Sequence, residues 1–161
     1  MAFDAFMKID GIPGESTDAD HNGWIEVLSF DHEVIQPVSK TASSAGGGTA
    51  ERAEYSGFVF VKNVDMASPK FYEASFRGTH IKEITIDFCR AGGKKEKYLQ
   101  VVMKQVIVSK FKQCSGGEFP IEKVELSPGI VTMDYIKQDR ATGTPSGSVA
   151  AGWNLITNTT A

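Results

Sequence analysis

The sequence contains few of the residues that crosslink a chain or carry catalysis. Its two cysteines, Cys89 and Cys114, have neither the spacing nor the neighbours of a metal knuckle or a redox pair. The three histidines, His21, His32 and His80, are too scattered to form a His-x-x-x-His metal-binding pair, and we expect them on the solvated surface. A Gly-x-Ser-x-Gly nucleophile elbow is also missing. We therefore expect no cofactor, no metal and no enzymatic activity, and two reduced thiols in a protein that folds in the cytosol.

Basic charge and long apolar runs are scarce as well. The formal net charge of −3 argues against a nucleic-acid partner, because binding to a phosphate backbone is driven by counterion release. No apolar run approaches the roughly 20 residues that span a bilayer, so we expect no membrane insertion. Residues 1–20 have Lys8 as their one basic residue and lack a cleavable apolar segment, which argues against a signal peptide. A chain of 161 residues with 41% hydrophobic residues is expected to form one soluble domain over residues 1–161.

Alternating apolar and polar residues predict a mainly β fold. Phe3, Ala5, Met7 and Ile9 share one parity of the opening strand, as in a strand with one buried face. Further strands are expected over residues 24–30, 58–61, 84–89 and 98–111, then in a last hairpin formed by 121–126 and 130–137, and at 152–156. About seven strands favour a small antiparallel β-barrel that is closed or nearly closed, because closure removes aggregation-prone edges.

One short helix and two polar connections interrupt the strands. Ser68 is the expected N-cap, Pro69 the first helical residue and Gly78 the stop. Residues 39–55 are predicted to be an extended loop, since 39–50 contain no large apolar residue to bury. Residues 140–150 are predicted to be a flexible spacer.

An acidic stretch matches the first half of a calcium-binding EF-hand loop. Asp18, Asp20 and Asn22 occupy positions 1, 3 and 5, and Gly23 occupies position 6. Position 12 is Ser29, where the loop needs a bidentate glutamate, and flanking helices are missing. We expect a turn that begins a strand. A calcium-dependent module or a hydrolase built on these carboxylates is an alternative.

Several segments, taken in order, resemble the Hcp (haemolysin-coregulated protein) family of type VI secretion tube proteins over nearly the whole chain. They are the opening residues 1–16, the glycine-bearing loop 39–48, Ser68-Pro69 before the helix, Arg90-Ala91-Gly92-Gly93 followed by Tyr98-Leu99, and Gly152-Trp153-Asn154-Leu155. The resemblance implies a β-barrel with one helix, six copies of which close into a ring, and rings that stack into a tube.

The same resemblance implies partners and a location. The partners are further copies of the chain, the sheath, spike and baseplate proteins of the type VI apparatus, and small effectors carried in the lumen. The chain would leave the bacterial cytoplasm through this apparatus without a cleaved signal peptide.

The loop over residues 39–55 is the candidate for contact between stacked rings, because a pliable arm can order when it docks. Exposed ion pairs contribute only about 0–1 kcal/mol each, so apolar and main-chain contacts would supply most of the affinity. The candidate stacking residues are Ser39, Ser43, Gly46, Gly47, Gly48, Glu51, Arg52 and Glu54.

The strand over residues 98–111 is apolar on both faces in places, so its second face should pack against a neighbouring subunit or against the chain's own helix. A different class of function is a monomeric barrel that binds a small molecule in its interior. Interior positions filled by Phe, Ile, Val and Leu argue for a packed interior instead.

Overall fold

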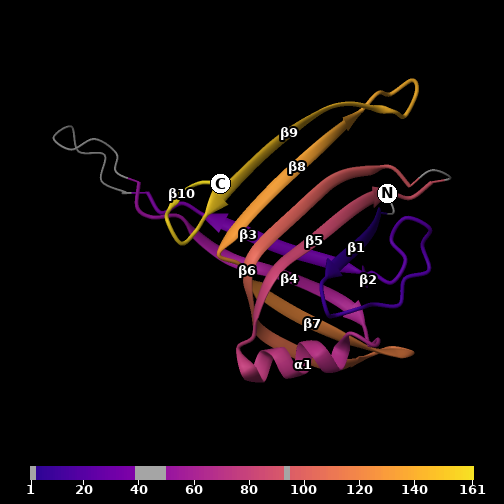
Figure 1. Cartoon of the computed structure of the whole chain (residues 1–161), viewed down its shortest axis with the longest axis vertical. Helices are drawn as coiled ribbons and strands as arrows, with labels where there is room; N and C mark the ends of the chain where they lie inside the picture. The colour runs from indigo at the N-terminus through magenta and orange to yellow at the C-terminus, as the bar shows by residue number, and fades with distance from the viewer. Residues whose placement is uncertain (1–2, 39–49, 93–94) are drawn as a thin grey trace.

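The computed structural model describes residues 3–38, 50–92 and 95–161, which form a strongly curved antiparallel sheet with one helix at its end (Figure 1). The strands are β1 (Phe3–Ile9), β2 (Ile25–Val27), β3 (Ser29–Ile35), β4 (Glu54–Asn63), β5 (His80–Arg90), β6 (Lys97–Gly116), β7 (Phe119–Ser127), β8 (Ile130–Gln138), β9 (Pro145–Asn154) and β10 (Thr159–Thr160). The helix α1 spans Ser68–Arg77. No helix in these ranges has the length and apolar character needed to cross a membrane.

The mainly β class and several individual elements were predicted correctly. β1 lies where the alternation predicted a strand, and Ala5, Met7 and Ile9 are buried as expected, whereas Phe3 is 38% exposed. β5 and β6 form the predicted antiparallel hairpin, with Ile84 opposite Met103 and Ile86 opposite Val101. The expected strand over residues 24–30 is instead two strands, β2 and β3, which meet at Leu28.

The long strand β6 organises the sheet by taking part in two curved layers. Its first half pairs with β5 on one edge and β8 on the other, whereas its second half pairs with β7. From β5 the sheet continues to β1 and β2, and from β7 it continues to β4 and β3. The two ends of this circuit, β2 and β3, do not pair with each other, so hydrogen bonds between the described strands do not close it. The chain itself connects β2 to β3 at Leu28, whose N–H donates to Val61 O at 2.8 Å.

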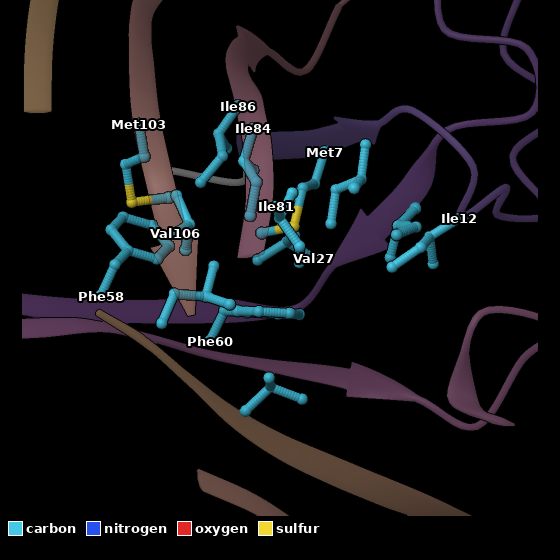
Figure 2. Close-up of a cluster of buried hydrophobic side chains, with 14 of the residues drawn as sticks. Met7, Ile12, Val27, Phe58, Phe60, Ile81, Ile84, Ile86, Met103 and Val106 are labelled. Carbon is cyan, nitrogen blue, oxygen red and sulfur yellow. The ribbon is translucent and has the colours of Figure 1, made fainter. Parts of the chain in front are cut away.

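The barrel interior is filled with side chains. Phe58, Phe60, Ile84, Ile86 and Met103 are among the fully buried residues that meet between the two layers (Figure 2). Side chains occupy the space between the layers in the described part of the chain, so the alternative of a ligand-binding barrel is not favoured.

The predicted hairpin between residues 121–126 and 130–137 is wrong, although both strands exist. β7 and β8 lie one after the other along the same edge of β6, so the chain passes Ser127-Pro128-Gly129 without reversing. Gly129 N–H donates to the carbonyl oxygens of Lys104 at 3.0 Å and Gln105 at 3.1 Å. Gln105 has a left-handed φ of 54°, which bends β6 at the junction of its two halves. The reversals lie elsewhere, between β6 and β7 and between β8 and β9.

The helix is present with its predicted stop but not its predicted cap. Gly78 ends α1 in the left-handed conformation, with φ of 60°. Ser68 lies inside the helix, and the Asp65 carboxylate instead accepts from Ala67 N–H at 2.9 Å. Phe71 and Ala74 face the core, and Tyr72 packs edge-on against Phe111 of β6 at 5.6 Å, so the helix covers part of that strand.

Both predicted connections are shorter than expected. Glu54 and Tyr55, assigned to the extended loop, belong to β4 and pair with Ile35 and Val34. Most of the predicted spacer 140–150 is strand, since β9 begins at Pro145. The small side chains of this segment suggested a linker. They are compatible with a strand because the main chain, and not the side chains, forms the hydrogen bonds to the neighbouring strand.

Candidate functional site

The hairpin of β8 and β9, called the wing below (residues 130–154), projects from the barrel on the side away from α1 (Figure 1). β8 pairs with β6 only between Leu99 and Lys104. β9 pairs with β8 along its length, and β10 covers only Trp153 and Asn154. Much of the wing therefore has strand neighbours on one side only.

One face of the wing continues the hydrophobic face of the barrel. Val101 and Met103 are fully buried in the core, and the residues paired with them on β8 are Met133 and Val131. The next row places Tyr135 beside Val149, which are 45% and 75% exposed. Exposed apolar patches often belong to interaction sites, so this face is a candidate assembly surface. The sequence did not indicate this exposed face, because the apolar residues of the wing have the alternation of ordinary core residues.

The predicted stacking residues divide into three groups. Ser39, Ser43, Gly46, Gly47 and Gly48 lie outside the described residues, and Glu54 lies in β4. Glu51 and Arg52 lie beside the bridge between Val38 and Ala50, where the two sides of the segment meet.

Main-chain and side-chain contacts fix the base of this segment to the rest of the subunit. Glu51 N–H donates to Pro37 O at 3.1 Å, and the Gln36 amide donates to Glu51 O. The Arg52 guanidinium donates to the carbonyl of Leu155, which follows the wing. Arg52 therefore joins the base of the predicted stacking loop to the base of the wing.

The half-matched calcium loop forms a turn whose carboxylate binds the protein's own groups. Asp18 Oδ1 accepts from the N–H groups of Asp20 and His21, at 3.1 and 3.2 Å. Lys95 Nζ lies 2.8 Å from Asp18 Oδ2 and 3.1 Å from Asp4. Both carboxylate oxygens of Asp18 therefore contact the protein's own donors, and no cluster of three metal-binding side chains occurs in the described part of the chain.

His21 lies at the centre of this turn and is buried, so its predicted surface position is wrong. Its ring stacks on Phe6 at 4.4 Å, with Nδ1 3.0 Å from Asp18 and Nε2 3.3 Å from Asp87. His32 is half-buried and His80 is exposed. The loop over residues 11–24 thus covers the outer face of β1 and β5, which sequence spacing alone did not indicate.

Asp18 should make the stability of the subunit sensitive to acid. Lys95 and His21 hold the pKa of Asp18 well below its ordinary value of 3.8. A lowered folded-state pKa contributes stability above the unfolded value, and this contribution is lost as pH falls through the folded value. We expect Asp18→Asn to lower the urea midpoint at pH 7, with the difference from wild type shrinking between about pH 4 and pH 2. A difference that stays constant over this range would contradict this role of Asp18.

A second polar cluster, also missed from the sequence, fastens α1 to the sheet. Lys62 of β4 and Glu122 of β7 are direct cross-strand partners, and both are fully buried. Lys62 Nζ lies 2.9 Å from Glu122 and 2.7 Å from Asp65. Ser68 at the start of α1 donates to Glu122 at 2.9 Å. This arrangement explains why Ser68 does not cap the helix.

Comparison with known proteins decides the family. Residues 6–135 match the family model described as "Type VI secretion system effector, Hcp". The chain belongs to the Hcp family. It is 33% identical over 161 residues to protein hcp1 of Pseudomonas aeruginosa, and the match covers 98% of each chain.

Solved structures agree with this family assignment. One described as a type six secretion system protein has a TM-score of 0.91 at 30% identity, covering 99% of this chain and 100% of the other. Hcp1 from Salmonella typhimurium has a TM-score of 0.81 at 29% identity, with both chains covered completely. As an Hcp protein, the chain is a subunit of the type VI secretion tube.

Proposed function

We propose that this Hcp subunit closes into hexameric rings by burying the apolar face of its wing against the neighbouring copy, and that the rings stack into a hollow tube. The observation that supports the wing assignment is the row of exposed Met133, Tyr135 and Val149 on the face that continues the barrel core. Burial of apolar surface contributes about 25 cal/mol per Å², so covering several large side chains gives a substantial driving force.

A ring also needs a second, different surface on each subunit. Contacts in a cyclic assembly are head-to-tail, so the patch on one copy meets a complementary patch elsewhere on the next. Val64, Met66, Tyr72 and Phe76 form a separate exposed apolar group at and just before α1. This group lies on the opposite side of the subunit from the wing (Figure 1), as a head-to-tail contact requires.

The role proposed here is structural rather than enzymatic, and it brings further partners. Family membership supports contacts with the sheath, spike and baseplate proteins, and transport of effectors in the lumen. It also supports export from the bacterial cytoplasm through the type VI apparatus without a cleaved signal peptide. For stacking, we propose the loop that includes Ser39, Ser43, Gly46, Gly47, Gly48 and the adjacent Glu51, Arg52 and Glu54.

Native mass spectrometry and negative-stain imaging of the purified protein test the ring. We expect hexamers with a central hole for the wild type, and monomers for Tyr135→Glu combined with Val149→Glu, because two like charges on directly opposite residues would be buried without partners. Thr142→Glu, in the exposed turn at the tip of the wing, is the matched control and should still form rings. A wild-type protein that stays monomeric at micromolar and higher concentrations would contradict the proposal, as would rings formed by the double variant.

A further inference from the structure

Three exposed lysines lie together on the outer side of the layer formed by β3, β4, β7 and the second half of β6. Lys112 of β6 is the direct cross-strand partner of Lys123 of β7, and Lys110 lies two residues from Lys112 along β6. The helix α1 packs on the inner side of the same layer, where the ring centres of Phe71 and Phe60 are 5.7 Å apart. The surface formed by the three lysines is called the basic face below.

The positive charges of the basic face are not neutralised within the part of the subunit that the structure describes. Lys110 stands opposite Glu125, but no ion pair between described residues includes Lys110, Lys112 or Lys123. Other lysines of the chain do contact a carboxylate, namely Lys62, Lys70, Lys95, Lys97 and Lys104. The basic face therefore presents a concentrated positive charge on a chain whose net charge is −3.

The pair of Lys112 and Lys123 opposes folding, because like charges on directly opposite strand residues are destabilising. Lysines on an edge strand can prevent aggregation, and this accounts for Lys110 and Lys112, since the second half of β6 pairs with β7 alone among the described strands. It does not account for Lys123, because β7 lies between β4 and β6. An unfavourable charge on an interior strand points to a role in binding.

Aliphatic side chains lie beside the lysines on the same face. Val61 of β4 is the cross-strand partner of Lys123 on its other side, and Ile121 lies two residues from Lys123 along β7. Both are half-buried, so part of each side chain remains accessible. A polypeptide can use both charge and aliphatic contacts on such a surface, whereas binding to a phosphate backbone is driven by charge alone.

We propose that the basic face holds the cargo of the ring and selects polypeptides with acidic segments. This inference rests on the proposed function, in which the ring carries effectors in its lumen. The proposed contacts between neighbours use the wing face and the apolar group at α1, so they leave the basic face uncovered. Each copy in the ring adds the same three lysines, and an acidic segment that contacts several copies gains affinity from the high effective concentration of the later contacts.

Binding of an acidic peptide to assembled rings tests this selectivity. The probe is a fluorescein-labelled peptide of alternating Glu and Ala, compared by fluorescence anisotropy with a Gln and Ala peptide of equal length. We expect the acidic peptide alone to bind, and to bind more weakly as salt screens the charges. The test variant combines Lys110→Gln, Lys112→Gln and Lys123→Gln. Its Kd for the acidic peptide should rise about tenfold or more, since three charges are lost from every copy.

A matched control separates the basic face from the net charge of the ring. It replaces three exposed lysines elsewhere, Lys8→Gln, Lys82→Gln and Lys104→Gln, and it should bind the acidic peptide within about twofold of the wild type. The test variant removes a like-charge pair, so it should form rings and unfold at an unchanged or higher urea midpoint. Equal weakening of peptide binding by the two triple variants would overturn the assignment to the basic face.

Cross-linking locates the contact directly. A carbodiimide couples carboxylates of the acidic peptide to nearby lysine amines, and mass spectrometry should find the products at Lys110, Lys112 and Lys123. Coupling mainly at other lysines, or wild-type rings that do not bind the acidic peptide, would overturn the inference and leave the ring intact. Tighter binding of single-stranded DNA of equal charge would overturn the choice of a polypeptide. A wild type that stays monomeric in native mass spectrometry would refute the proposed function itself.

Discussion

Replacing Lys62 with methionine should lower the free energy of unfolding by about 3–5 kcal/mol, because removing one partner leaves Glu122 as an uncompensated buried charge. Glu122 is fully buried, and without Lys62 its remaining partners are the neutral groups of Ser68 and Gln113. Asp65 loses the same ammonium, which lies 2.7 Å away. Urea denaturation of the monomer, followed by circular dichroism, measures this loss.

The double variant Lys62→Met with Glu122→Leu is the control for this prediction. Replacing both members of a buried ion pair with apolar groups of similar volume is often neutral or stabilising, so most of the lost stability should return. The exposed pair of Arg77 and Glu73, 2.9 Å apart on α1, provides a comparison, and Arg77→Met should change stability by about 1 kcal/mol or less. A small effect of Lys62→Met would show that the cluster does not hold α1 to the sheet.

The sequence predicted those elements whose pattern arises from local burial. β1, the β5–β6 hairpin and α1 each place apolar residues at the period of their secondary structure, and Gly78 stops the helix because it accepts a left-handed conformation. Pairing between strands was harder to predict. Ser127-Pro128-Gly129 has the composition of a reversing turn, but the bend of β6 at Gln105 allows β7 and β8 to share one edge.

The candidate assembly surface could not be predicted, because it depends on where strands end relative to one another. Met133 and Tyr135 have the alternation of core residues, and they are exposed because β8 extends beyond the barrel. Val149 fell in a segment that looked like a linker, since its small neighbouring residues give no strand signal. The buried pair of Lys62 and Glu122 likewise depends on the register between β4 and β7, which the sequence does not specify. The family resemblance indicated assembly but not these positions.

Replacing Phe58 with alanine should also have a large effect, about 3–5 kcal/mol of unfolding free energy, because it removes a large buried ring and leaves a cavity. Phe58 is fully buried in β4, and its ring stacks parallel to Phe30 of β3 at 5.8 Å. The ring of His32, the cross-strand partner of Phe58, has its centre 5.4 Å from the centre of the Phe58 ring. Part of the lost stability should therefore come from weaker pairing between β3 and β4.

Hydrogen exchange separates a local loss from a global one. In Phe58→Ala, amides of β3 should exchange faster than those of β5 and β6, because the bulge between His32 and Val34 already weakens that ladder. Phe119→Ala is the matched control, since that ring is 69% exposed and its loss should change monomer stability by about 0.5 kcal/mol or less. Since β3 and β4 support the base of the predicted stacking loop, Phe58→Ala should weaken stacking more than ring closure. Uniform acceleration of exchange across all strands would show instead that β3 opens only when the whole subunit unfolds.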